Sequence, residues 1–176
     1  KHLKVTPINE PHKILVGDVS FDLYPGRTTC IVGESGSGKS LTALSIMKLL
    51  STQLKQTGDI SFEGKNISQL SNVEMRSFRG KSMAMIFQEP MTSLNPVLTV
   101  GDQIKEALNV HLNLDNNSLN KKVLSLFKEV GISEDRISSY PDELSGGQRQ
   151  RIMIAMSIAC EPLILIADEP TTALDV

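Results

Sequence analysis

The glycine-rich segment at residues 33–40, GESGSGKS, constrains the fold of this 176-residue chain more than any other feature. It matches the pattern G-x-x-x-x-G-K-[S/T] at every fixed position. Such a loop binds an anion when it joins a strand to a helix, because its main-chain N–H groups and the helix amino terminus then converge. The β-branched run TTCIVG before it predicts a buried strand, and LTALSIMKLL after it predicts a helix. The segment therefore favours an α/β fold.

The loop is expected to hold the phosphates of a nucleoside triphosphate. Lys39 would supply a mobile cation, and the Ser40 hydroxyl would lie where Mg²⁺ bridges two phosphates. The alternative is a glycine- and serine-rich turn that binds nothing, which the flanking strand and helix make the weaker interpretation. The residues predicted to bind the nucleotide here are Gly33, Glu34, Ser35, Gly36, Ser37, Gly38, Lys39, Ser40 and Leu41.

The rest of the chain alternates between strand-like and helix-like segments. Strands are predicted within 13–26, singly or as a pair, and at 59–67, 82–88 and 163–167, of which the last two are apolar enough to be buried. Apolar residues at helical spacing predict two amphipathic helices between 99 and 130, joined by the polar hinge LDNNS, as a helical lobe. A third helix is expected through QRQRIMIAMSIA, with Ser145 as its cap and Pro162 ending it.

Composition narrows the classes of partner and compartment. The 18 Lys+Arg and 20 Asp+Glu residues leave a net charge of −2. The chain therefore has no excess of basic residues to bind the phosphate backbone of a nucleic acid. Cys30 and Cys160 lie in separate hydrophobic runs without metal-type spacing, so reduced core thiols in a cytosolic protein are expected. The longest apolar run, 152–160, is too short to span a bilayer, and the amino end lacks the apolar block of a secretory signal.

Two further motifs could take part in phosphate chemistry. Asp168 and Glu169 end the strand-like run LILIA, where one carboxylate could hold a Mg²⁺-bound water and the other could polarise an attacking water. Ser145 and the glycine pair after it would form a second anion-binding helix start, one more than a single triphosphate needs. This second site either binds another anion or completes a site on another molecule. The structural alternatives are a solvated loop start and an ordinary helix cap.

Together these motifs make the chain resemble the nucleotide-binding subunits of ATP-binding cassette (ABC) transporters. The resemblance rests on GESGSGKS, the glutamine in FQEP, the signature LSGGQ, the run LILIADEP and the segment ALD, which occur in the family's order. It implies an α/β P-loop ATPase domain with a RecA-like core sheet, amino-terminal β-strands and a helical subdomain. One incomplete domain over 1–176 is expected, with the core at 1–90, the helical subdomain at 91–150 and a return to the core at 151–176.

The family's switch histidine would lie beyond Val176, since His2, His12 and His111 are all misplaced for it. The chain is therefore expected to be truncated at its carboxyl end.

The resemblance also implies roles for individual residues in binding ATP and Mg²⁺. Ser40, Gln88 and Asp168 would lie at Mg²⁺, and Glu169 would be the general base, with Gln88 also catalytic. Two subunits of the family pair head to tail, so the signature of one would cap the γ-phosphate held by the other, and Asp175 would couple the two sites. The signature residues predicted to contact the nucleotide are Ser145, Gly146, Gly147 and Gln148.

The stretch FQEPMTSLNPVLTVGDQI resembles the peptide and nickel importer branch of the family. The expected function is an ATPase that couples hydrolysis to uptake of peptides, glutathione or nickel chelates through transmembrane permease subunits. Its expected place is the cytoplasmic face of a bacterial membrane. The expected partners are an identical or homologous second ATPase subunit and, indirectly, an extracytoplasmic solute-binding protein. No nucleic acid partner is expected. A non-transport ABC ATPase is the alternative, and a small-molecule P-loop kinase would leave LSGGQ without a role.

Overall fold

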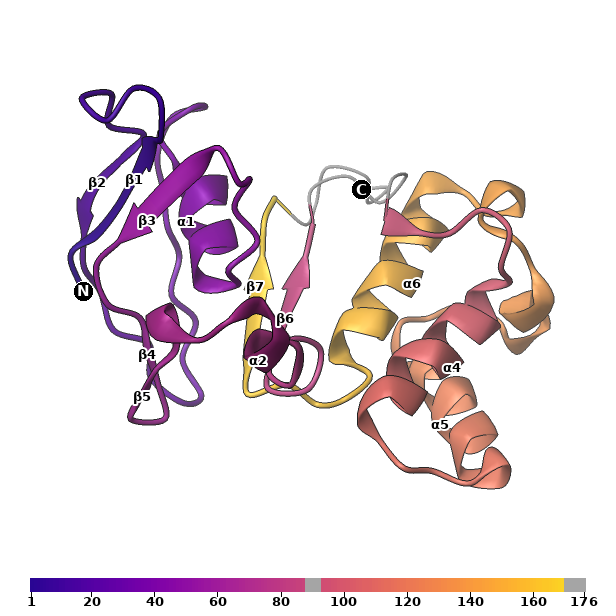
Figure 1. Ribbon diagram of the computed structural model, residues 1–176. Helices are drawn as coiled ribbons and strands as arrows, with labels where there is room; N and C mark the ends of the chain where they lie inside the picture. The colour runs from indigo at the N-terminus through magenta and orange to yellow at the C-terminus, as the bar shows by residue number, and fades with distance from the viewer. Residues whose placement is uncertain (88–92, 170–176) are drawn as a thin grey trace. The chain divides into compact units, whose positions relative to one another are not determined.

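The computed structural model describes residues 1–87 and 93–169 and divides the chain into two compact units, Lys1–Arg76 and Ser77–Val176. Figure 1 shows the helices and strands of the two units.

The first unit contains a three-stranded antiparallel sheet in the order β2–β1–β3. The strands are β1 (Leu3–Pro7), β2 (Val16–Val19) and β3 (Leu54–Thr57), so β1 lies between its two neighbours. Alternation along β1 buries Leu3 and Val5 and exposes Lys4, as expected for a sheet with one covered face.

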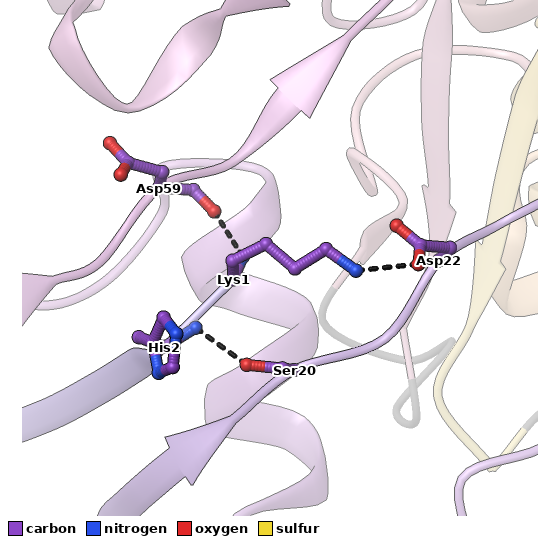
Figure 2. Close-up of polar contacts among 5 residues, drawn as sticks. All are labelled: Lys1, His2, Ser20, Asp22 and Asp59. Carbon is purple, nitrogen blue, oxygen red and sulfur yellow. Dashed lines mark hydrogen bonds and ion pairs between the residues drawn. The ribbon is translucent and has the colours of Figure 1, made fainter.

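The start of β1 is held from both sides. The main-chain N–H of His2 donates to the Ser20 hydroxyl at 2.7 Å, and the main-chain nitrogen of Lys1 donates to the Asp59 carbonyl (Figure 2). The Lys1 ammonium pairs with Asp22 at 2.5 Å.

Helix α1 (Lys39–Ile46) follows the glycine-rich loop. Beyond β3 come the hairpin of β4 (Ser61–Phe62) and β5 (Lys65–Asn66), the 3₁₀ turn η1 (Ile67–Gln69) and α2 (Asn72–Arg76). The buried apolar side chains of this unit are Leu3, Val5, Val16, Ala43, Met47, Phe62, Ile67, Leu70 and Met75.

The second unit contains a parallel strand pair. Strands β6 (Met83–Ile86) and β7 (Ile164–Ala167) pair from Met83 opposite Ile164 to Ile86 opposite Ala167. Every residue of β6 is buried, which confirms the buried strand predicted there. The connection between the two strands runs through the helices of this unit, as parallel pairing requires.

Helices α4 (Val100–His111) and α5 (Asn116–Glu129) are the two amphipathic helices predicted between 99 and 130, and α6 (Gly146–Ile158) is the third predicted helix; we call the three the helical lobe. The turns η2 (Glu134–Ser138) and η3 (Pro141–Glu143) lie between α5 and α6. Ile104, Leu108, Val123 and Phe127 are buried in one core cluster, as their helical spacing predicts. The side chains of Thr99, Asp115 and Ser145 cap the three helices.

Several predicted strands differ from the structure. Residues 28–33 form no strand among the described residues, and Ile31 and Val32 are exposed. Their β-branched composition favours an extended backbone, but a strand also needs a neighbour to bond its main-chain groups. Only 16–19 of the segment 13–26 form a strand, and 59–67 gives the hairpin β4–β5 instead of one edge strand, because Glu63 and Gly64 adopt left-handed turn conformations. Strand β7 is half-buried, with alternating exposure.

The prediction of two core thiols is wrong for Cys30, which is exposed because its segment does not enter a sheet. Cys160 is half-buried, its thiol lies 3.7 Å from the Ala107 carbonyl oxygen, and desolvation raises its pKa. Within the described ranges, no helix is both long and apolar enough to cross a membrane.

Candidate functional site

The phosphate loop, residues 33–40, has the backbone that its glycines predict. Gly36 and Gly38 have φ of 79° and 92°, in the left-handed region that favours glycine. A Cβ at Gly38 would stand 2.9 Å from the Leu15 carbonyl oxygen and from a methyl carbon of Val16. The loop therefore packs directly against the start of β2, where no larger residue fits.

The Lys39 ammonium lies across this loop. It donates to the carbonyl oxygens of Gly33 and Glu34, at 2.9 Å each. The Glu34 carbonyl also accepts the main-chain N–H of Ser37 at 3.2 Å, which closes a turn. An ammonium has three donors, so Lys39 can keep both loop contacts and still bond an anion. Residues 33–37, including Ser35, are exposed, so such an anion could reach the loop.

Helix α1 begins directly after the loop, with Gly38 as its N-cap. Ser40 and Leu41 lie in its first turn and are half-buried. The first turn contains no acidic residue, and both the helix dipole and the Lys39 ammonium make this helix start positive. The arrangement favours a bound anion.

The two acidic residues lie at the carboxyl end of β7. The Asp168 main-chain N–H donates to the Ile86 carbonyl at 3.0 Å, which continues the β6–β7 ladder by one bond. Asp168 is half-buried, whereas Glu169 is exposed and has a left-handed φ of 49°. Both carboxylates thus follow the end of a parallel strand, where ligands of α/β sheets bind.

The signature residues form a reciprocal cap at the start of α6. The Ser145 hydroxyl accepts the N–H of Gln148 at 3.2 Å, and the Gln148 side-chain oxygen accepts the N–H of Ser145 at 3.0 Å. Gly146 is exposed, and a Cβ added there would meet nothing within 4 Å, while Gly147 is half-buried. The cap prediction is confirmed, and the exposed Gly146 leaves this helix start open to an approaching molecule.

The structure places the predicted residues in both units. The phosphate loop belongs to the first unit, whereas Asp168, Glu169 and the signature belong to the second. Gln88 and Asp175 lie outside the described residues.

Sequence reasoning missed one buried polar contact in the helical lobe. The Gln103 side chain on α4 accepts the N–H of Asn95 at 2.9 Å and donates to the carbonyls of Asn95 and Leu98, at 2.9 and 3.1 Å. These bonds hold the turn from Asn95 to Leu98, which leads into α4. Helical spacing was the available signal, since Gln103 lies three residues after Val100 and four before Ala107, but its main-chain partners leave no pattern in the sequence.

The chain has three features typical of P-loop nucleotide-binding proteins with an α/β fold. They are a glycine-rich loop of the P-loop pattern that opens a helix, two adjacent acids at the end of a parallel strand, and a second helix start with a glycine pair. Comparison with known proteins gives the family. A family model described as ABC transporter matches residues 16–172. The chain therefore belongs to the ABC transporter family.

Curated relatives are similar over nearly the whole chain. A dipeptide transport ATP-binding protein, DppD of Bacillus subtilis (strain 168), is 55% identical over 165 residues, covering 92% of this chain and 49% of that protein. A glutathione import ATP-binding protein, GsiA of Escherichia coli O1:K1 / APEC, is 48% identical over 190 residues, covering 100% of this chain and 30% of that protein. The chain thus spans half or less of the length of these relatives.

Solved structures confirm the fold. The dimeric post-hydrolysis state of the ATP-binding cassette MJ0796, bound to ADP and Pi, matches with a TM-score of 0.84 and 27% identity over 98% of this chain and 76% of that chain. The α/β cassette fold predicted from the motifs is thereby confirmed.

Proposed function

We propose that this chain is the ATP-hydrolysing subunit of an ABC importer for small peptides. The observation that carries the proposal is the phosphate loop, in which the Lys39 ammonium lies over two loop carbonyls at the start of a helix without acidic residues in its first turn. An arrangement of this charge and shape suits the phosphates of ATP.

In this proposal the loop holds the phosphates and its own glycines make the close approach possible. Main-chain N–H groups of residues 36–40 donate to phosphate oxygens, and Lys39 adds a positive charge beside them. A Cβ at Gly33 would stand 2.6 Å from the Ser37 hydroxyl oxygen, which would have to rotate away to make room.

Mg²⁺ fits the donors that the chain offers. The Ser40 hydroxyl and the Asp168 carboxylate are hard oxygen ligands, and Mg²⁺ usually binds one or two protein groups of this kind beside phosphates and water. Bound Mg²⁺ would neutralise charge on the phosphates during their transfer. Gln88 completes this predicted ligand set.

Glu169 is proposed as the general base. Its carboxylate follows the strand that ends in Asp168, and its left-handed φ is a strained conformation of the kind that collects at functional sites. A carboxylate in this place can accept the proton of an attacking water.

The second helix start supports a head-to-tail dimer. The Ser145 hydroxyl accepts the Gln148 N–H, so its own proton remains to be donated to a phosphate oxygen. With Gly146 open, the signature residues Ser145, Gly146, Gly147 and Gln148 could cap the γ-phosphate on a second subunit. A dimeric cassette among the structural relatives supports such pairing.

The named relatives support small peptides as the cargo. They are a dipeptide transport and a glutathione import ATP-binding protein, similar over 92% and 100% of this chain. The proposal therefore places the chain at the cytoplasmic face of a bacterial membrane, bound to permease subunits that receive cargo from an extracytoplasmic solute-binding protein. The second ATPase subunit is either identical or homologous.

A carboxamide substitution at the proposed base tests the assignment. In the intact subunit, Glu169→Gln should bind MgATP with unchanged affinity and lose hydrolysis by at least about a hundredfold, because the amide cannot accept the proton. Glu129→Gln, an exposed change on α5, is the matched control and should hydrolyse like the wild type.

Lys39→Ala should abolish binding itself. Co-purification of the tagged intact subunit with its permease separates an importer from a non-transport ATPase. Hydrolysis by Glu169→Gln at the wild-type rate would refute the base assignment, and a wild-type subunit that binds no MgATP would refute the proposed function as a whole.

A further inference from the structure

Helix α1 ends in an unusual way at Lys48. Lys48 has a φ of 50°, in the left-handed region, and its main-chain N–H donates to the Ser45 carbonyl at 3.0 Å. The following N–H, of Leu49, donates to the Leu44 carbonyl at 2.9 Å. These two bonds form the Schellman type of helix ending, in which glycine usually occupies the left-handed position. A lysine there carries a steric cost that glycine would avoid.

The Lys48 side chain makes two hydrogen bonds that a glycine could not make. Its ammonium donates to the carbonyl of Ser68 at 2.9 Å and also to the carbonyl of Leu70. Both carbonyls lie at the carboxyl-terminal end of η1, where a positive charge is favourable. One side chain thus joins the end of α1 to a segment twenty residues further along the chain.

The segment that Lys48 reaches is itself held in place. The Ser68 hydroxyl accepts the N–H of Ile60 at 2.6 Å, and Asn66 caps η1 through the N–H of Ser68 at 3.0 Å. The Asn66 amide also donates to the Asp59 carboxylate at 2.7 Å. Because this network ties η1 to the hairpin β4–β5 and to the segment between β3 and β4, Lys48 anchors α1 to a fixed point of the first unit.

We propose that Lys48 is a positioning residue for the phosphate loop. The inference rests on the proposed function, since it concerns the same nucleotide site. Helix α1 has two anchors within its unit, Gly38 packed against Leu15 and Val16 at one end and Lys48 bonded to η1 at the other. The buried face of α1 packs within the unit, and the two anchors together fix the direction of the helix axis.

The effect of Lys48 on the nucleotide follows from the length of α1. An eight-residue helix is only about 12 Å long, so a small displacement at Lys48 tilts the whole helix about its Gly38 end. Lys39 and Ser40 lie beside this pivot, and the tilt changes the direction of their N–H groups and of the Ser40 hydroxyl more than it displaces them. Hydrogen bonds to phosphate weaken as their angles depart from linearity, so such a tilt is enough to weaken binding.

Three substitutions separate positioning from stability in the intact subunit. Lys48→Met keeps the length of the side chain but removes the ammonium, and we expect the Kd for MgATP to rise about tenfold. Lys48→Gly also removes the tether but relieves the left-handed strain, so its Tm should stay within about 3 °C of the wild type while the Kd still rises about tenfold. Lys48→Arg retains donors for both carbonyls, and its Kd should lie within about twofold of the wild type.

Lys55→Met serves as the matched control, because Lys55 is an exposed lysine on β3 of the same unit. Its Kd for MgATP should equal that of the wild type. Binding is measured by displacement of a fluorescent ATP analogue, and Tm is measured on the same preparations.

The outcomes distinguish the possibilities. A raised Kd in Lys48→Gly with a wild-type Tm supports the proposal, since a merely stabilising lysine would not alter affinity in that variant. A wild-type Kd in Lys48→Gly overturns it, as does a Kd in Lys48→Arg as high as in Lys48→Met. If Lys39→Ala loses binding while the Lys48 variants bind normally, the positioning role is wrong and the nucleotide site stands. If the wild type binds no MgATP, the proposed function itself fails.

Discussion

Replacing Gln103 should destabilise the helical lobe by an amount that follows from its contacts. The side chain is only 4% exposed and makes three hydrogen bonds, one from the Asn95 N–H and two to the carbonyls of Asn95 and Leu98. Each such bond contributes about 1 kcal/mol net, so Gln103→Met, which has nearly the same length and no polar head, should lower the free energy of unfolding by about 2–3 kcal/mol.

Replacing Gln103 by glutamate, which has the same shape and a negative charge, gives a second test. In Gln103→Glu one carboxylate oxygen can still accept the Asn95 N–H, but the other faces two carbonyl oxygens and is repelled by them. At about pH 7 this variant should be at least as unstable as Gln103→Met. Near pH 4.5 it should recover stability relative to Gln103→Met, because burial and the facing carbonyl oxygens raise the pKa of this carboxyl above the ordinary value of about 4.3, so the folded lobe holds it protonated and it donates one bond again.

Urea denaturation followed by far-ultraviolet circular dichroism measures these changes, and hydrogen exchange at the Asn95 amide reports the loss of its acceptor locally. Glu106→Gln on the exposed side of α4 is the control and should change stability by less than about 0.5 kcal/mol. If Gln103→Met changes stability by no more than this control, and the Asn95 amide stays protected, the reasoning from the three bonds is refuted.

Two further predictions concern the second unit. Ser145→Ala should lower the free energy of unfolding by about 1 kcal/mol, because α6 loses the acceptor for its Gln148 N–H. Ser145→Thr keeps a hydroxyl acceptor and should be more stable than Ser145→Ala, and denaturation that shows the two to be equally unstable would contradict this reasoning. Burial, with a smaller contribution from Lys81, lowers the pKa of His111 below its ordinary 6.5, so the unfolded chain takes up a proton before the folded one does. Stability should therefore fall as the pH drops from 6.5 towards that lower pKa, and denaturation of His111→Gln over the same range should lack this component.

Much of the helical lobe could be predicted because its signals are local. The spacing of Ile104, Leu108, Val123 and Phe127 marks the buried faces of α4 and α5, and the cap of α6 needs only Ser145 and the residue three positions later. Strand β6 was also predictable, since a short apolar run bounded by polar residues suits a buried strand.

What could not be predicted depends on partners distant in the sequence. The run at 28–33 has strand composition, yet no pattern in those residues says whether a neighbouring strand will pair with them. The exposure of Cys30 follows from the same missing information. In the candidate site, the motif residues could be recognised, but the contacts of Lys48 and Gln103 end on main-chain carbonyls, which every residue possesses.

The central place of β1 bears on the order in which the first unit is synthesised and folds. β1 pairs with β3 along four residue pairs, from Lys4 opposite Thr57 to Pro7 opposite Leu54. On the ribosome these early residues can join β2 soon after emerging, but their second edge has no partner until β3 has been made, after the whole phosphate loop and α1. The nascent loop therefore leaves the exit tunnel attached to an unfinished sheet, in which β2, against whose start Gly38 packs, covers one edge of β1 while the other edge stays open until β3 is made.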